Sequence, residues 1–324
     1  MKDRHGRTVD YLRVSITDRC NYRCKYCMPE EGVNTGSKED ILSLEGIVKL
    51  VRASNNLGIH KVRLTGGEPL VRRGIEKLIS MLNRTCSVED LSLTTNGSLL
   101  KEKAQALARS GLNRVNISLD SLDPETFNQL TRVGNLDHVL DGIRAAKEAD
   151  LNPIKLNAVM IEDVNDDEAL DLAQFALDHQ VVVRYIGLMP MGEAASSGLR
   201  SANLDQIRNK LEKRWTLQPS SVRVGSGPAS YYQISEGGQR GKIGFIFARQ
   251  HPFCKSCNKI RVTSRGALRP CLAREEELLL PEPPEQLSQK RIEHKLHEAI
   301  EAKPFSHNWS QNESTSSEMS TIGG

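Results

Sequence analysis

The chain has 324 residues and a formal net charge of +3 at pH 7, so it is long enough for one large or two ordinary domains. So mild a charge excludes the strongly basic surface that is typical of nucleic-acid-binding domains. No stretch reaches the roughly 18 apolar residues of a membrane-spanning helix, and the charged segment 1–10 lacks the apolar centre of a secretory signal. We therefore expect a cytoplasmic protein with no nucleic-acid and no membrane partner.

Strand and helix patterns alternate along the first 186 residues. Period-2 alternation of apolar and polar residues predicts a strand over 12–17, and further strands are expected at 61–65, 91–95, 114–120, 154–160 and 181–186. Helical patterns are found at 43–55, 72–83, 98–109, 135–149 and 166–178. Strands that alternate with helices in this way predict repeated βα units and a parallel sheet.

One face of the expected strands is apolar, whereas the other is polar. The polar face carries Arg13, Ser15, Lys61, Arg63, Thr65, Ser92, Thr94, Asn116, Ser118, Asp120, Lys155 and Asn157, and Arg184 is expected to join it. A closed eight-stranded barrel fills its interior with branched apolar side chains, so a polar inner face predicts a wider or incomplete barrel with a wet cavity. Buried cations are destabilising without an anion, so the cavity is expected to bind a negatively charged ligand. Arg and Lys side chains favour phosphate groups as that ligand. Pairing with acids, or a solvated sheet edge, remains the alternative.

Three cysteines follow the first strand at once. Cys20, Cys24 and Cys27 have the spacing C-x3-C-x2-C, and Tyr26 precedes the last of them. Three thiolates can hold a four-iron cubane by three irons and leave the fourth iron open to a small ligand. Zinc would need a fourth ligand, and no His or Cys lies in the thirty residues after Cys27.

A second triplet lies in the C-terminal part, after a helical pattern at 203–213 and a hairpin pattern at 231–247. Cys254, Cys257 and Cys271 predict either a second cubane with an open iron or a zinc site completed by His251. The seventh cysteine, Cys86, receives no role. An apolar stripe at helical spacing over 287–300 predicts a docking helix, and the Ser- and Thr-rich segment 304–324 predicts a flexible tail.

The motifs together resemble the molybdenum cofactor biosynthesis protein A family of the radical S-adenosylmethionine (SAM) superfamily, over nearly the whole chain. They are the two cysteine triplets, Thr65-Gly66-Gly67-Glu68-Pro69-Leu70, Leu93-Thr94-Thr95-Asn96-Gly97, Asn116-Ile117-Ser118-Leu119-Asp120 and the terminal Gly323-Gly324. The resemblance implies an α/β fold: an incomplete (β/α)6 TIM-type barrel over 1–200, closed by an α+β region over 201–303 that carries a second iron–sulfur cluster. The tail 304–324 completes the expected organisation.

The resemblance also implies an activity. This is a lyase-type, radical SAM-dependent conversion of GTP to (8S)-3',8-cyclo-7,8-dihydroguanosine 5'-triphosphate, the first step of molybdenum cofactor biosynthesis. It implies two [4Fe-4S] clusters, one binding SAM and one binding the guanine. Expected partners are GTP, a reductant such as flavodoxin or ferredoxin, and the downstream cyclic pyranopterin monophosphate synthase. The sequence leaves the oligomeric state open, with a homodimer as one option.

Roles carried over by motif give the expected site. Metal ligands are the six cysteines of the two triplets, and the SAM site comprises Tyr26, Gly66, Gly67, Ser118 and Met189. The GTP site comprises Arg13, Lys61, Arg63, Thr94, Lys155, Arg184, Lys259, Ile260 and Arg261. The catalytic set is Arg13, Arg261, Gly323 and Gly324, because the diglycine tail of the family enters the active site.

Two departures and two alternatives accompany the resemblance. Lys259-Ile260-Arg261 stands where the family has Arg-x-Arg, which keeps the charge but loses one forked donor, and Gly187 stands where an acidic residue is common. A radical SAM enzyme that modifies a peptide with an auxiliary cluster is one alternative, although that class usually carries more C-terminal cysteines. A non-enzymatic zinc-binding module with a nucleotide pocket is the other.

Overall fold

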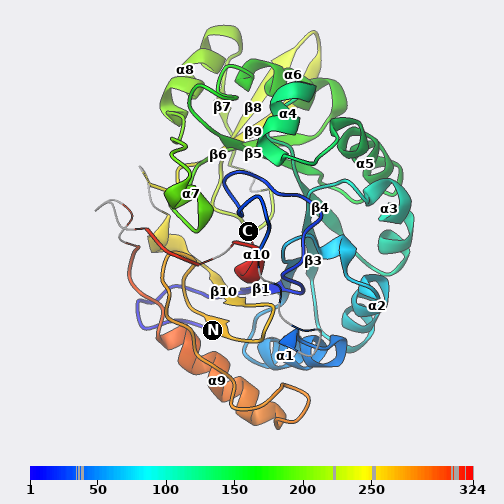
Figure 1. Ribbon diagram of the computed structural model, residues 1–324, viewed down its shortest axis with the longest axis vertical. Coiled ribbons are helices and arrows are strands. Elements are labelled where there is room, and N and C mark those ends of the chain that lie inside the picture. Colours follow the sequence, from blue (N-terminus) through cyan, green and yellow to red (C-terminus); the bar gives the residue numbers. More distant parts are fainter. Residues whose placement is uncertain are drawn as a thin grey trace.

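A single curved sheet organises the protein (Figure 1). The computed structural model describes residues 1–33, 35, 37, 40–221, 224–249, 253–307, 309, 314–317 and 319–323, and the elements below belong to this part of the chain. Eleven strands are paired in the order β11-β10-β1-β2-β3-β4-β5-β6-β9-β8-β7. The first six are β1 (Tyr11–Ser15), β2 (Lys61–Thr65), β3 (Asp90–Thr95), β4 (Arg114–Ser118), β5 (Lys155–Met160) and β6 (Val182–Gly187). They pair in parallel and in sequence order, which confirms the six predicted strands.

Helices cover the outer, apolar face of the sheet, as the ring of coils in Figure 1 shows. The predicted helices are confirmed as α1 (Leu44–Asn56), α2 (Ile75–Thr85), α3 (Leu100–Arg109), α5 (Leu136–Glu148) and α6 (Ala169–His179). The short α4 (Pro124–Thr131) was not predicted. Its N-terminus is built from standard signals, since the Asp123 side chain accepts from the Thr126 amide and Pro124 takes the first helical position.

Two strands from the C-terminal part extend the parallel sheet at both edges, which the sequence analysis did not predict. β10 (Lys259–Val262) pairs in parallel with β1, and β9 (Gln239–Ile246) pairs in parallel with β6. Next to β9 lie β8 (Ser230–Glu236) and β7 (Gln218–Pro219), and β11 (Leu268–Arg269) lies antiparallel next to β10. Strands from both sides of the expected boundary at residue 200 therefore join one sheet.

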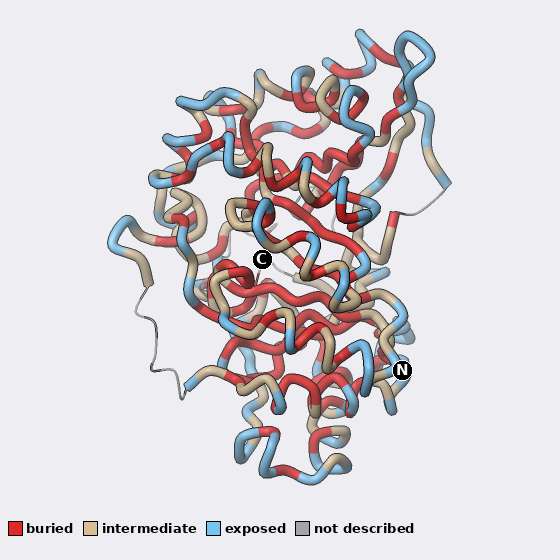
Figure 2. The backbone as a smooth tube through the Cα atoms, turned by 90° about the vertical axis from the view of Figure 1, so that its right-hand side faces the viewer, coloured by how far each residue is buried: buried red, intermediate tan, exposed pale blue. Residues whose placement is uncertain are grey.

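The core lies between the outer face of the strands and the helices, where buried segments run through the centre of the molecule (Figure 2). Leu12, Val14, Val62, Leu64 and Ile117 are fully buried there. These are the apolar members of the alternating strands, so the alternation fixes which side chains face the cavity on the other side of the sheet.

The 3-10 turn η2 (Pro69–Val71) follows β2, and the short α7 (Glu193–Ser196) follows β6. The C-terminal part adds α8 (Leu204–Arg214), the 3-10 turn η3 (Cys254–Ser256), α9 (Gln289–Glu301) and α10 (Met319–Ile322). α9 packs on α1 and buries Ile292, Leu296 and Ile300, as the apolar stripe predicted. No helix in the described residues is long and apolar enough to cross a membrane.

The described part of the tail differs from the expected flexible segment. α10 lies at the centre of the barrel beside the C-terminus (Figure 1), and Ser320 and Ile322 are almost fully buried. Ile322 belongs to a small apolar cluster with Met191, Ala273 and Trp309, and the Thr315 carbonyl accepts from the Gly192 amide. The segment is mostly polar, so its composition did not predict that these few apolar residues would pack against the barrel.

Candidate active site

The first cysteine triplet lies on the loop that leaves the C-terminal end of β1. The backbone of this loop is tied to the end of α4, because the amides of Arg23 and Lys25 donate to the carbonyls of Thr131 and Leu130. Arg132 then donates from one guanidinium nitrogen to the carbonyls of Arg23 (2.9 Å) and Met28 (3.0 Å). The unpredicted helix α4 and Arg132 thus fix the loop that presents the thiols.

The thiols of the first triplet lie within electrostatic reach of one another. Burial is the largest cause that raises the pKa of Cys24 well above its usual value, and Cys27 and Cys20 add to it. Burial likewise raises the pKa of Cys20 to about 11. All seven cysteines of the chain are free thiols, so neither triplet is consumed by a disulfide.

Tyr26, inside the triplet, connects this loop to the end of β4. Its hydroxyl donates to Asp120 Oδ2 at 2.5 Å, and Asp120 Oδ1 accepts from the Val159 amide. Burial raises the pKa of Asp120 to about 6, against the lowering effect of these two hydrogen bonds. Ser118, another predicted SAM residue, ends β4 two positions earlier, so Tyr26 and Ser118 are brought to the same end of the barrel.

Gly66 and Gly67 let the backbone after β2 come close to another group, and in the structure that group is the backbone of residues 17–19. A Cβ at Gly66 would lie 2.4 Å from the Thr17 carbonyl oxygen, and a Cβ at Gly67 would lie 2.4 Å from that of Arg19. The amides of Gly67 and Glu68 donate to the same two carbonyls. The glycines therefore press the loop after β2 against the segment that leads into Cys20.

The second triplet is assembled by strand topology. Cys257 comes two residues before β10, and Cys271 comes two residues after β11, which runs antiparallel to β10. Both thiols therefore lie at the N-terminal end of β10, and Cys254 lies just before them in η3. Burial raises the pKa of Cys271, and Cys257 and Cys254 add to the effect, so these thiols are also close together.

The two triplets lie at opposite ends of the barrel. β10 runs parallel to β1 with Lys259 opposite Tyr11, so the second triplet stands at the N-terminal end of the strands. The first triplet follows the C-terminal end of β1. A five-residue strand at about 3.3 Å per residue places roughly 16 Å of inner face between them.

Cations cover this intervening inner face. Strand register puts Arg261, Arg13 and Arg63 side by side on β10, β1 and β2. Arg184 on β6 and Lys155 on β5 lie on the same inner face, where Arg184 is opposite Asn157, and all five cations are nearly fully buried. These side chains confirm the predicted polar face, with β10 as an addition to it.

Crowding of like charges perturbs the cations. Burial lowers the pKa of Lys155 to about 6, and Arg114, Arg184 and Arg63 lower it further. Burial lowers the pKa of Arg63 to about 10 and that of Arg261 to about 10. Arg184 Nε, Arg114 Nη1 and Thr94 Oγ1 are buried without a hydrogen-bond partner among the described residues. Unsatisfied buried donors among crowded cations are suited to binding an anionic ligand.

Two adjoining cavities open onto this surface. One, of about 170 Å³, is lined by Arg13, Arg63, Thr94, Arg184, Lys259 and Arg261 together with the three cysteines of the second triplet. The other, of about 830 Å³, contains Lys61 and Asp10. Gly227, Pro228, Phe253 and Lys259 line both, so the segment Gly227–Pro228 stands between a cationic chamber and a larger opening.

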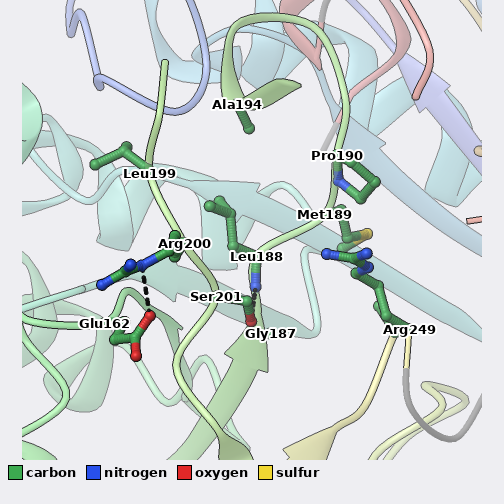
Figure 3. A pocket seen from close by; sticks show the side chains of 11 residues that line it. Glu162, Gly187, Leu188, Met189, Pro190, Ala194, Leu199, Arg200, Ser201 and Arg249 are labelled. Atoms are coloured by element: carbon green, nitrogen blue, oxygen red, sulfur yellow. Dashed lines mark hydrogen bonds and ion pairs between the residues drawn. The ribbon is translucent and has the colours of Figure 1, made fainter. Parts of the chain in front are cut away.

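A third pocket, of about 520 Å³, lies beyond the C-terminal end of β6 (Figure 3). Met189 and Arg249 lie on one side of it, and the ion pair between Arg200 and Glu162, at 2.7 Å, lies on the other. Met189 also lines the cationic chamber, so this predicted SAM residue stands between the two spaces. Gly187 lines the pocket, and a Cβ there would lie 3.3 Å from Ser201 Oγ.

The described end of the tail lies next to the chamber, because Met319 lines it and Gly323 contacts Arg261, which also lines it. Arg261 Nη1 donates to the Gly323 carbonyl at 2.6 Å. A Cβ at Gly323 would lie 2.2 Å from Thr65 Cγ2. Gly324, the other predicted catalytic glycine, lies outside the described residues, as does His251, the fourth ligand of the zinc alternative.

Three predicted GTP residues do not line the chamber. Ile260 pairs with Leu12 and is fully buried in the apolar core, because alternation turns it away from Lys259 and Arg261. Lys61 pairs with Asp10 at 2.6 Å in the adjoining cavity. Lys155 does not line the chamber but lies beside it, where its Nζ donates to the Val224 carbonyl at 2.6 Å.

Four functional candidates were missed by sequence reasoning. Tyr11 lines the chamber under the guanidinium of Arg63, and Arg114 pairs with both carboxylate oxygens of Asp90 at 2.8 and 2.6 Å. Extending the alternation by two residues in β1 and β4 would have found both. Lys303 and Arg7 contact the second triplet from distant segments, and no local pattern marks them.

The donor sets fit iron–sulfur clusters. Each triplet offers three thiols, the number that leaves one iron of a cubane open. Among the described residues, no three His, Cys, Asp or Glu side chains form a group that could hold a single metal ion. The six cysteines would hold the clusters, with the cationic chamber between them.

Comparison with known proteins supports this assignment. Residues 14–176 match the Radical SAM superfamily, and residues 181–309 match Molybdenum Cofactor Synthesis C. GTP 3',8-cyclases from Petrotoga mobilis and Syntrophomonas wolfei are each 43% identical to this chain, and that from Desulforamulus reducens is 42% identical, all over 100% of both chains. The solved structure of Streptococcus suis SuiB bound to S-adenosylmethionine has the same fold, with a TM-score of 0.63 at 15% identity over 91% of this chain and 68% of that one.

Proposed function

The chain belongs to the GTP 3',8-cyclase family, and from this premise we propose that it converts GTP to (8S)-3',8-cyclo-7,8-dihydroguanosine 5'-triphosphate, the first step of molybdenum cofactor biosynthesis. Its radical SAM domain implies a [4Fe-4S] cluster and SAM, and the family carries a second cluster in the C-terminal region. One observation carries the proposal most directly. A chamber lined by buried cations lies between two thiol triplets, each of which leaves one iron of a cubane open.

Different ends of the barrel would bind different parts of the reacting groups. Cys20, Cys24 and Cys27 would hold a cluster that binds SAM, and together these groups would supply the radical chemistry that removes a hydrogen atom from ribose C3'. Cys254, Cys257 and Cys271 line the chamber, which supports binding of the guanine next to the second site. The nucleotide must therefore lie along the inner face, with its base toward the N-terminal end of β10 and its ribose toward the first triplet.

The cations hold the triphosphate. Arg184 Nε and Arg114 Nη1 are unsatisfied donors that phosphate oxygens would accept from, and Lys155 lies between these two side chains. Arg261 binds the Gly323 carbonyl and so couples the tail to the chamber. The family's Arg-x-Arg becomes Lys-x-Arg here, and Lys259 compensates as a point charge that lies over the Phe253 ring at 5.7 Å.

Partners follow from the same reaction. The chemistry consumes one electron per SAM cleaved, for which a flavodoxin or a ferredoxin is the proposed donor. The product is the substrate of cyclic pyranopterin monophosphate synthase, the proposed downstream enzyme. A homodimer is a further proposal, which light scattering of the reconstituted protein tests.

The direct test is anaerobic reconstitution followed by incubation with dithionite, SAM and GTP. We expect about eight irons per chain and the formation of 5'-deoxyadenosine with a cyclised guanine nucleotide. ATP in place of GTP is the matched control, and equal turnover of both would contradict the guanine assignment. Bound zinc without iron would support the binding-module alternative. Modification of a peptide would support the other alternative, for which the 15% identity to SuiB offers a shared fold alone.

A further inference from the structure

The second cysteine triplet is surrounded by segments that are far apart in the chain. Cys254 and Cys257 lie before β10, Cys271 follows β11, and residues 303–305 follow α9. The N-terminal residues 1–9 also reach this place. The short pairing of β10 with β11 and the single turn η3 connect the cysteine arms, and side chains add the contacts to the N-terminal residues and to residues 303–305.

Lys303 joins three of them. Its side chain is 2% exposed, and its ammonium donates to the carbonyls of Lys259 (2.6 Å) and Pro270 (2.9 Å) and to Cys257 Sγ (3.7 Å). Pro270 directly precedes Cys271. One ammonium therefore contacts both arms of the triplet, and among the described residues its partners are carbonyls and a thiol rather than a carboxylate.

Arg7 joins the remaining arm. Its guanidinium donates to the carbonyls of Cys254 (2.9 Å), Pro304 (2.8 Å) and Phe305 (3.1 Å). Asp3 holds this side chain in place, because Asp3 Oδ2 accepts from Arg7 Nε at 2.6 Å and Asp3 Oδ1 accepts from the Arg7 amide at 2.9 Å. The side chain of Arg7 is 7% exposed and that of Asp3 is fully buried.

Arg7 and Lys303 differ in whether a carboxylate neutralises their charge. Arg7 is neutralised by Asp3, whereas the ammonium of Lys303 is buried against neutral carbonyls and one sulfur. A buried ammonium without a counter-ion is strongly destabilising. A cubane on three thiolates has a net negative charge, which increases on reduction, so a cluster at this triplet would supply the missing anion.

We propose that Lys303 and Arg7 are positioning residues for the second triplet: Arg7 holds the Cys254 arm, and Lys303 holds the Cys257 and Cys271 arms and stabilises the reduced, more negative state of the group bound there. This inference rests on the proposed function only in taking that group to be an iron–sulfur cluster. Hydrogen bonds to ligand sulfur and nearby charge are the established means by which proteins set cluster potentials.

The test isolates the second site in the full-length protein. In a background with Cys20, Cys24 and Cys27 each changed to Ser, only the second triplet can bind a cluster. Lys303→Met in this background should make the reduction potential more negative and should raise the rate at which an iron chelator strips the cluster by about 10- to 100-fold. Lys303→Arg should restore most of the potential, and Lys290→Met, an exposed lysine on α9, should change neither quantity.

Arg7→Met should increase the rate of iron loss but shift the potential less than Lys303→Met, because Arg7 contacts a backbone carbonyl and is already paired with Asp3. Unaltered potential and retention in Lys303→Met would overturn the inference. So would a lowered unfolding midpoint of the metal-free protein with no change in potential, since that describes a purely structural lysine. If the wild-type chain fails to cyclise GTP while Lys303→Met still shifts the potential, the proposed function fails and this inference stands.

Discussion

Lys155 should take up a proton when GTP binds. Burial lowers its pKa to about 6, and Arg114, Arg184 and Arg63 add to the effect, so at pH 7.5 the ligand-free protein carries mainly a neutral amine there. A triphosphate neutralises the neighbouring cations and favours the charged form, which returns the pKa toward its usual 10.5. Binding at pH 7.5 should therefore consume about one proton per GTP.

The sign of the pH dependence follows from proton counts. Between about pH 6 and pH 10 the bound state holds one proton more than the free state, so the affinity for GTP falls as pH rises, by about tenfold or 1.4 kcal/mol per pH unit. Below about pH 6 both states are protonated and this dependence ends. For the same reason the free energy of unfolding of the ligand-free protein should rise with pH through this window, because the unfolded chain binds the proton that the folded one lacks.

The assay is calorimetric titration of GTP in buffers with different ionisation enthalpies, from which the proton uptake is obtained directly. Lys155→Met is the control, because it retains a long apolar side chain and corrects for titration of the nucleotide's own γ-phosphate. An uptake in the wild type that equals the uptake in Lys155→Met would refute the assignment of the proton to Lys155. A GTP affinity that stays constant from pH 6.5 to pH 8.5 would refute it as well.

Three further predictions each compare a variant with a matched control. Gly323→Ala should lower GTP turnover at least about tenfold, because its Cβ would lie 2.2 Å from Thr65. Gly6 has a similar positive φ but open space around it, so Gly6→Ala should cost only about 1 kcal/mol of stability and leave turnover unchanged. Asp90→Asn should lower the free energy of unfolding, measured with urea, by about 3 kcal/mol, because it leaves the buried Arg114 charge unpaired. Asp141 forms an ion pair with the exposed Lys101, so Asp141→Asn should lower the free energy of unfolding by less than about 1 kcal/mol. Arg132→Met should speed the chelation of iron from the first triplet by about tenfold, and Arg144→Met on the exposed face of α5 should not. If the variant and its control had equal effects in any pair, the role given to the contact in that pair would be refuted.

The six barrel strands could be predicted because each carries its own alternating pattern. β10 could not, since it has four residues and its partner β1 lies about 250 positions earlier in the chain. That omission also left the direction of the Ile260 side chain unpredicted. A motif of three consecutive residues was assigned to one ligand, whereas a strand turns its middle residue to the opposite face, here into the apolar core.

The supports of the two triplets were also beyond local prediction. Arg132, Arg7 and Lys303 act through backbone carbonyls of distant segments, and any residue type can supply a carbonyl. A contact of this kind leaves no signature in the partner's sequence. The cysteines could be recognised because thiol chemistry restricts their spacing, while the residues that hold them in place are visible only in the folded protein.

The net charge of +3 conceals an uneven distribution of charge. Arg13, Arg63, Arg184, Arg261 and Lys155 are gathered on one inner face, where burial lowers the pKa of each. Bringing them together costs free energy in the absence of an anion, and that cost is recovered when GTP binds. Lys155 contributes to this cost because it has to give up its proton when the chain folds without an anion, so Lys155→Met should raise the unfolding midpoint without nucleotide and lower the increase that GTP produces. A purely structural lysine would lower the first of these quantities, and the sign of that change decides between the two roles.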